Sequence, residues 1–113
     1  MEKESCEIVD IWEVLGKRWS LHILKNLSTN GVVRFNELKR LIPEISSTVL
    51  SDRLLELERE GLISKKILPQ IPIRVEYSLT TQAKELQPIL HQLNDWVNRW
   101  DSHKIKYKPG LKT

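Results

Sequence analysis

Short hydrogen-bonding side chains gather in one stretch of the sequence, ISSTVLSDR, residues 45–53. They are Ser46, Ser47, Thr48, Ser51 and Arg53. Hydroxyl groups and a guanidinium can bond to the phosphates or to the base edges of a nucleic acid, and arginine can bond guanine through two donors. The same serines can instead do no more than cap a helix, by accepting hydrogen bonds from its first N–H groups. The residue types support both interpretations about equally.

Basic residues flank a second segment, ILPQIPIRVEYSLT, residues 67–80, whose apolar and polar side chains alternate as in a half-buried strand. Pro69 and Pro72 cannot donate to a strand ladder, so we expect them at the tip of a hairpin, where pairing has ended. Proline also lowers the conformational entropy that such a tip loses when it docks.

The cations of this hairpin are Lys65, Lys66 and Arg74. Three cations on one projecting element favour contacts with phosphates, and Arg34 is placed to extend them from a neighbouring segment. Alternatively, lysine on an exposed strand edge serves only to discourage aggregation. That alternative leaves the two tip prolines unexplained.

Cys6 is the only cysteine, so a disulfide within the chain is excluded. A thiol that senses oxidants must be exposed and must have a stabilised thiolate, which the start of a helix can supply. Glu4 and Glu7 flank Cys6 and disfavour the thiolate. Cys6 is therefore either a redox sensor or an inert thiol.

The remaining reactive side chains do not form a recognisable catalytic set. His22, His91 and His103 lack the spacing of a metal site. We also find no nucleophile–base pair and no glycine-rich phosphate loop. We therefore expect no enzyme activity, no metal and no cofactor.

The bulk composition is that of one ordinary folded domain of 113 residues with 29% charged residues. The net charge of +3 divides into −4 over residues 1–16 and +7 over the rest, and such a basic body suits a polyanionic partner. No apolar run approaches the roughly 20 residues that span a bilayer. The acidic start does not fit a signal peptide. We therefore expect a cytoplasmic protein with no membrane partner.

Apolar spacing and turn residues predict a mostly helical chain with one small β-hairpin, in the α+β class. The predicted elements are helix 8–15, helix 17–27, a turn at 28–31, an extended piece at 32–34, helix 35–42, helix 46–60, hairpin 62–79 and a long helix from 80 or 81. Leu50, Leu54 and Leu57 should form the buried row of helix 46–60, and Gly61 should end this helix in a left-handed conformation. Pro88 should kink or restart the last helix. Two helices joined by PEISS and followed by a hairpin describe a winged helix-turn-helix. We place this domain at residues 1–102 and a basic flexible tail at 103–113.

The first and last helices carry more apolar surface than a minimal winged helix needs. Ile8, Ile11, Trp12 and Leu15 have the spacing of one helix face. A monomer would leave much of this surface in water, and such patches mark partner sites. We therefore predict that both terminal helices form a homodimer interface, through Ile8, Trp12, Leu90, Leu93, Trp96, Val97 and Trp100. The alternative is that the aromatic residues fold back on their own domain.

Four segments match one family in order and spacing. They are CEIVDIWEVLGKRWSLHIL from Cys6, RFNELKRLIPEISSTVLSDRLLELEREGLI from Arg34, PQIPIRVEYSLT from Pro69 and LQPILHQLNDW from Leu86. In these segments the chain resembles the HxlR-type winged-helix transcriptional regulators, relatives of the MarR group.

The resemblance implies a homodimer that binds a palindromic operator in double-stranded DNA. Helix 46–60 would be the recognition helix in the major groove, with Ser47, Thr48, Ser51 and Arg53 on it, and Arg74 would lie on a wing along the flanking backbone. It also implies a sensor role for Cys6, since several relatives sense electrophiles or oxidants through a cysteine near the N-terminus. Relatives often have proline where Glu7 stands here.

The competing hypothesis is a winged-helix module for protein–protein contact, in which the basic hairpin is only a solvated edge. Neither hypothesis predicts a particular small-molecule effector.

Overall fold

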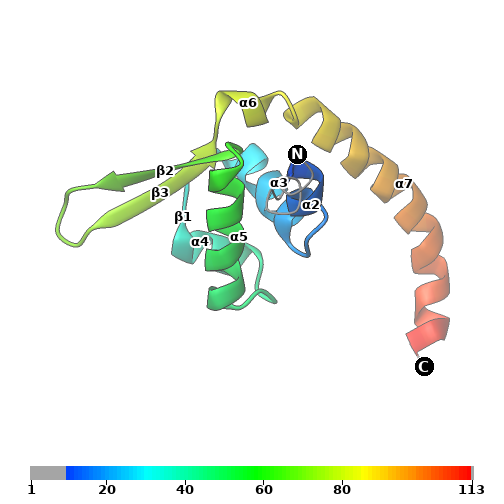
Figure 1. Cartoon of the computed structure of the whole chain (residues 1–113). Helices are drawn as coiled ribbons and strands as arrows, with labels where there is room; N and C mark the ends of the chain where they lie inside the picture. The colour runs from blue at the N-terminus through cyan, green and yellow to red at the C-terminus, as the bar shows by residue number, and fades with distance from the viewer. Residues whose placement is uncertain (1–9, 113) are drawn as a thin grey trace, which may run out of the picture.

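Helices α3, α4 and α5 surround the base of a small antiparallel sheet, and a long hairpin projects from it (Figure 1). The computed structural model describes residues 10–112, with side chains as far as residue 100. The elements are α2 Ile11–Leu15, α3 Ser20–Asn30, β1 Val33–Arg34, α4 Phe35–Leu41, α5 Ser47–Arg59, β2 Ile63–Leu68, β3 Arg74–Leu79, α6 Thr81–Lys84 and α7 Gln87–Lys112. This order confirms the predicted winged helix-turn-helix.

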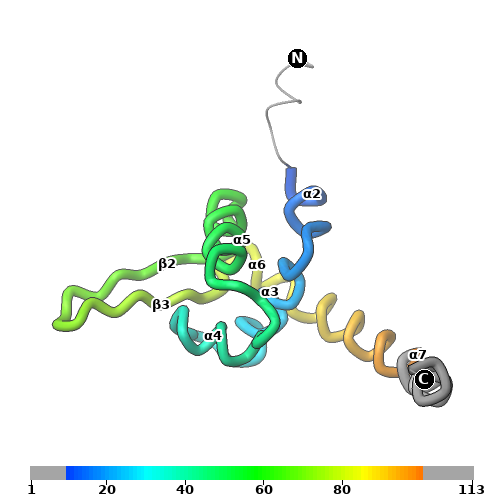
Figure 2. Tube along the Cα trace, turned by 90° about the horizontal axis from the view of Figure 1, so that it is seen from below, coloured from blue at the N-terminus to red at the C-terminus, as the bar shows by residue number. Residues whose placement is uncertain are grey.

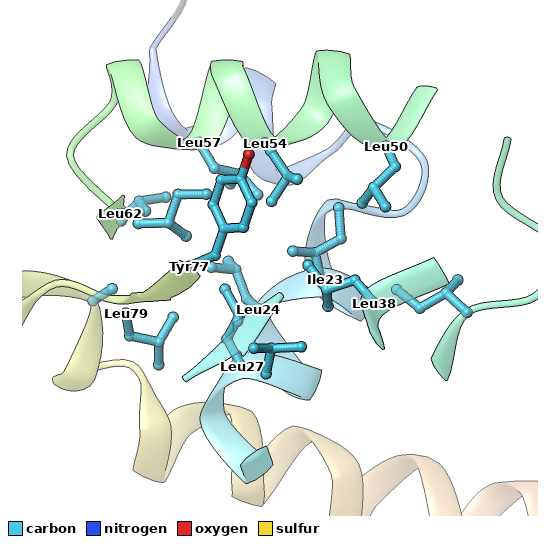
Figure 3. Close-up of a cluster of buried hydrophobic side chains, with 14 of the residues drawn as sticks. Ile23, Leu24, Leu27, Leu38, Leu50, Leu54, Leu57, Leu62, Tyr77 and Leu79 are labelled. Atoms are coloured by element: carbon cyan, nitrogen blue, oxygen red, sulfur yellow. The ribbon is translucent and has the colours of Figure 1, made fainter. Parts of the chain in front are cut away.

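The core lies between α5, α3 and the base of the sheet. Figure 3 shows the α5 leucines pointing toward α3, with Tyr77 of β3 beside them. The predicted buried row of α5 is confirmed, because Leu50, Leu54 and Leu57 are each at most 2% exposed. Close packing of this kind fixes the angle at which α5 leaves the domain.

The predicted helix signals act through specific hydrogen bonds. Ser46 caps α5, since its Oγ accepts a hydrogen bond of 3.1 Å from the N–H of Val49. Gly61 has a φ of +77°, the left-handed conformation that glycine adopts without a Cβ clash. Thr80 caps α6 in the same way as Ser46, accepting from the N–H of Ala83.

The sheet has the strand order β1-β3-β2, with both pairings antiparallel. The β2–β3 ladder runs from Ile63 opposite Leu79 to Leu68 opposite Arg74. Pro69 and Pro72 therefore lie beyond the last pair, as predicted. The predicted apolar face of the second strand is buried only near the base, because the outer part of the hairpin extends past the helices.

Two helix boundaries near the N-terminus differ from the prediction. Helix α3 begins at Ser20 rather than residue 17, because Trp19 at its N-cap has a left-handed φ of +80°. This conformation is energetically unfavourable for a residue with a Cβ. A cation–π contact stabilises the Trp19 ring in place, because the Arg18 guanidinium lies 4.7 Å from the ring centre. The helix continues through the predicted turn as far as Asn30, and only Gly31 ends it.

The predicted apolar stripe of α2 is only partly buried in this chain. Val14 is its buried residue, at 1% exposed, whereas Trp12 is 83% exposed. Leu15 of the predicted stripe is half-buried and packs against the core, so Val14 and Leu15 anchor this five-residue helix while Trp12 faces solvent.

The C-terminal helix is interrupted and then restarts, as Pro88 predicted. Helix α6 ends at Lys84 and α7 begins at Gln87, which places Pro88 in the first turn, where its missing N–H is tolerated. Helix α7 leaves the body on the side opposite the wing (Figures 1 and 2). The backbone stays helical to Lys112, where the sequence predicted a non-periodic tail from residue 103. Within residues 10–112, no helix combines the length and apolar character needed to cross a membrane.

Candidate nucleic-acid interface

Helices α4 and α5 and their connection form the helix-turn-helix. Ile42 and Ile45 of the connection are buried, which anchors it to the core. The Nζ of Lys39 donates a 2.9 Å hydrogen bond to the carbonyl oxygen of Ile45. Lys39 therefore closes the turn from α4, and the start of α5 is held in place.

The start of α5 presents short hydroxyl side chains to solvent. Ser46, Ser47, Thr48 and Ser51 are all exposed. Ser47 and Ser51 are four residues apart and Thr48 and Ser51 three apart, so they share one face of the helix. The predicted hydroxyl readers are thus brought together, on the part of a recognition helix that contacts base edges.

Arg53 is turned toward its own domain. Its Nε donates a 2.9 Å hydrogen bond to the carbonyl oxygen of Arg18, and its Nη1 lies 3.2 Å from Glu56 Oε1. The other carboxylate oxygen of Glu56 is 2.9 Å from the Nζ of Lys17. This cluster, which we call the Glu56 cluster, ties α5 to the connection between α2 and α3. The base-reading role of Arg53 stays a prediction, and it would require the guanidinium to leave both partners.

Three of the predicted phosphate-binding cations surround one carboxylate on the sheet. In the strand register, Glu76 of β3 lies opposite Arg34 of β1 and opposite Lys66 of β2. Arg74 is two residues along β3, and its Nη1 is 3.8 Å from Glu76 Oε2. This face points away from the core, because Tyr77 and its buried neighbours occupy the other face.

Arg34, Lys66, Arg74 and Glu76 together carry two more positive charges than negative ones, and we call them the cationic face. Arg34 and Lys66 are exposed and Arg74 is half-buried. An outward surface of this charge suits contact with a polyanion.

Lys65 does not share the cationic face. It lies opposite Tyr77 in the ladder, so it projects from the other face of the hairpin. The sequence placed Lys65, Lys66 and Arg74 on one projecting hairpin, and they do lie on it, but Lys65 is on the opposite face from the other two. Adjacent residues of a strand point to opposite faces, so the sequence alone was enough to predict that Lys65 and Lys66 lie on different faces of the hairpin.

Tyr77 connects the sheet to α5 electrostatically. Burial raises the pKa of Tyr77 above its ordinary value, and the negative charge of Glu58 on α5 raises it further. The neutral phenol is therefore the stable form under this helix.

The predicted dimer residues divide into two groups. Trp12, Leu93, Trp96, Val97 and Trp100 expose between 36% and 83% of their surface. Leu90 differs, since it is only 9% exposed and packs in the core of its own chain. Its assignment to the dimer interface stays a prediction, although the first turn of α7 packs on the body of its own chain and the rest of the helix leaves the body after it. Ile8 and Cys6 lie outside the described residues.

Among the described residues, no group of three or more His, Cys, Asp or Glu side chains could hold a metal ion.

Comparison with known proteins identifies the family. The model of the HxlR-like helix-turn-helix family matches residues 14–105. This chain belongs to that family. It is 43% identical over 88 residues to the HTH-type transcriptional regulator YvaP of Bacillus subtilis (strain 168), covering 78% of this chain and 81% of YvaP. The chain is thus a transcriptional regulator with a helix-turn-helix fold, and the predicted resemblance is confirmed.

Solved structures agree with this assignment. The reduced form of HypR, described as a redox regulator, has a TM-score of 0.76 at 33% identity, covering 84% of this chain and 93% of HypR. The reduced form of the transcriptional regulator YodB of B. subtilis has a TM-score of 0.66 at 32% identity, covering 87% of this chain and 90% of YodB. The fold class predicted from the sequence is therefore confirmed.

Proposed function

We propose that this regulator acts as a homodimer that binds a palindromic site in double-stranded DNA. Helix α5 enters the major groove, and the wing formed by β2 and β3 follows the flanking backbone. The observation that carries the proposal is the cationic face, which gathers Arg34, Lys66 and Arg74 around one carboxylate beside an exposed recognition helix. Phosphate contacts of this kind orient a protein on DNA, while groove contacts supply specificity.

Ser47, Thr48 and Ser51 are the proposed groove contacts. Their hydroxyls can donate and accept, so each can bond to a base edge or to a phosphate. Ser46 contributes differently. Its oxygen already accepts from Val49, but its O–H proton is still available to donate to a phosphate near the helix start.

The proposed dimer forms through the exposed apolar residues of α2 and α7. Two winged helices related by a two-fold axis would place two recognition helices on two half-sites, which explains a palindromic operator. Such a protein works on chromosomal DNA, so we place it in the cytoplasm.

Footprinting and titration on DNA from the regulator's own upstream region test this proposal. Saturable protection of a palindromic site is expected, with an affinity that falls steeply as salt rises. Arg74→Glu should weaken binding to every sequence and reduce the salt dependence, whereas Thr48→Ala should change sequence preference. Lys84→Gln, which removes an exposed charge from α6, is the control and should change neither. Weak binding that is blind to sequence would refute the proposal.

Arg53→Ala tests the predicted base contact of Arg53 in the same titration. A changed base preference would support that contact. An unchanged preference, together with a lower free energy of unfolding, would assign Arg53 to the positioning of α5 alone.

A protein-interaction module is the second candidate. The observation in its favour is apolar exposure along the wing, where Ile67, Ile71 and Ile73 expose 58%, 101% and 69% of their surface. An apolar patch of this kind can mark a protein contact. If the footprint fails, substitution of Ile71 by aspartate should abolish binding to the protein partner of such a module.

We also propose that a thiol oxidant acts on this regulator through Cys6. The support is the similarity to HypR, described as a redox regulator, and to YodB, whose structure is also known after diamide treatment. Because the chain has one cysteine, the oxidised form would be a disulfide between subunits or with a small thiol. Diamide should weaken operator binding by the wild type and leave Cys6→Ser unchanged. Equal behaviour of the two proteins would assign Cys6 as inert.

A further inference from the structure

A notch of about 400 Å³ lies between the start of α4 and the outer part of the wing. Its polar lining consists of two arginines, Arg34 and Arg74, and two amide side chains, Asn36 and Gln70. Its apolar lining includes Ile73 and Val75. Among the described residues, no carboxylate lines the notch. Its lining therefore combines positive charge, amide donors and apolar side chains.

The strand register explains how residues forty positions apart come together here. Arg34 ends β1 opposite Glu76, and Arg74 lies two residues before Glu76 on the neighbouring strand. The N–H of Arg34 also donates a 2.8 Å hydrogen bond to Glu37 Oε1, which holds the start of α4 at the edge of the sheet. Glu76 is thus opposite Arg34 in the strand register and 3.8 Å from Arg74 Nη1, but it does not line the notch.

The chemistry of the notch matches one unit of a nucleic-acid backbone. A guanidinium binds phosphate oxygens through parallel N–H donors, and it does so better than a lysine point charge. Amide side chains add neutral donors to phosphate and sugar oxygens. The aliphatic floor suits the apolar faces of a deoxyribose, which a free anion would leave uncovered.

We propose that this notch binds a single phosphodiester of the DNA backbone, with Arg34 and Arg74 sharing one phosphate. Asn36 and Gln70 donate to the same nucleotide, and Ile73 and Val75 pack against its sugar. The proposal rests on the proposed function and names two contact residues, Asn36 and Gln70, that the sequence did not assign. One phosphate held by α4 and by the wing together fixes how far the wing lies from the groove that α5 enters.

Salt titrations on the footprinted duplex distinguish one shared phosphate from two separate ones. The proposed dimer carries each substitution twice, once in each half-site. If the arginines bound separate phosphates, R34Q and R74Q would each reduce the slope of log affinity against log salt by about 2 per dimer, and the double variant by about 4. With one shared phosphate in each half-site, we expect each single variant to reduce the slope by clearly less than 2 and the double variant by about 2. Additive reductions that reach about 4 would overturn the proposal.

Phosphate ethylation interference locates the contact independently. Ethylation of one phosphate in each half-site should weaken binding by the wild type and have no further effect on R34Q/R74Q. Asn36→Ala and Gln70→Ala should each weaken binding about 3- to 10-fold for each half-site contacted, the usual effect of one lost hydrogen bond per subunit. An interference pattern that is the same in wild type and double variant would overturn the proposal.

Two controls separate this result from failure of the proposed function. Lys66→Gln removes a cation from the cationic face outside the notch, so its effect on the slope should add to that of R34Q/R74Q. Lys84→Gln should have no effect. If the wild type protects no site, the proposed function fails and the notch proposal with it. If the wild type protects a site but the arginine effects are additive, the notch proposal alone fails.

Discussion

The Glu56 cluster provides the sharpest test of how the recognition helix is positioned. The substitution Glu56→Gln keeps the size of the side chain and removes its charge. It leaves Arg53 and Lys17 without the carboxylate that accepts from both of them. The Lys17 contact joins α5 to the connection before α3, and the Arg53 contact lies within α5 and orients the guanidinium that bonds to the Arg18 carbonyl, so the loss of both should lower the free energy of unfolding.

The expected magnitude follows from the exposure of the three side chains. Lys17 is 38% exposed, so water screens its ion pair to less than about 0.5 kcal/mol. Arg53 and Glu56 are 19% and 23% exposed, and a partly buried charged hydrogen bond contributes about 1 kcal/mol. Together they predict a loss of about 1–1.5 kcal/mol.

Urea unfolding at fixed protein concentration measures this loss. The destabilisation should be larger at low salt than at high salt, because screening weakens the native ion pairs. A double-mutant cycle of Glu56→Gln with Arg53→Met should give a coupling energy of about 0.5–1 kcal/mol. Asp52→Asn removes the same charge from an exposed position of α5 and is the matched control. If Glu56→Gln destabilises no more than Asp52→Asn, the cluster does not hold the helix.

Four further substitutions test other parts of the fold. Ser20→Ala should raise the free energy of unfolding by about 1 kcal/mol, because the buried Ser20 hydroxyl has no hydrogen-bond partner among the described residues; destabilisation in urea would contradict this. Gly61→Ala should destabilise by about 1 kcal/mol or more, since its φ is +77°, and an unchanged urea midpoint would refute the strain. The pKa of Tyr77 is raised on folding, so the free energy of unfolding should be retained below about pH 10 and fall as pH rises from there through the folded pKa. Tyr77→Phe should remove the part of this decrease that the ionisation of Tyr77 causes. Identical pH profiles of the free energy of unfolding for the two proteins would contradict the prediction. Trp100→Ser, at a site 51% exposed, should weaken the proposed dimer in sedimentation while the monomer stays folded.

Features that depend on neighbouring residues were predictable from the sequence. The cap at Ser46, the left-handed Gly61 and the position of Pro69 and Pro72 outside the ladder each need only local backbone geometry. The buried row of α5 was equally clear, because its leucines recur at helical spacing.

Features that depend on distant contacts were not predictable. In the sequence, Arg53 looked like a free donor on the recognition helix. In the structure its guanidinium bonds to the carbonyl of Arg18, 35 residues away in the sequence, and to Glu56, one helical turn away. Helix α3 starts late because Trp19 adopts a conformation that its residue type disfavours. Neither could be found without knowing how α2, α3 and α5 meet.

The arrangement of charges separates affinity from specificity in this molecule. The proposed groove contacts at the start of α5 are short neutral hydroxyls, whose hydrogen bonds each contribute modestly in water. The cations that we propose as phosphate contacts lie on the sheet, around Glu76, and the contribution of such contacts is independent of base sequence. Variants of the sheet should therefore change how tightly the protein binds any DNA, and variants of α5 should change which DNA it prefers. Because Arg34 ends β1 and caps the start of α4, the proposed phosphate contact at Arg34 would also fix the position of the helix-turn-helix on the DNA.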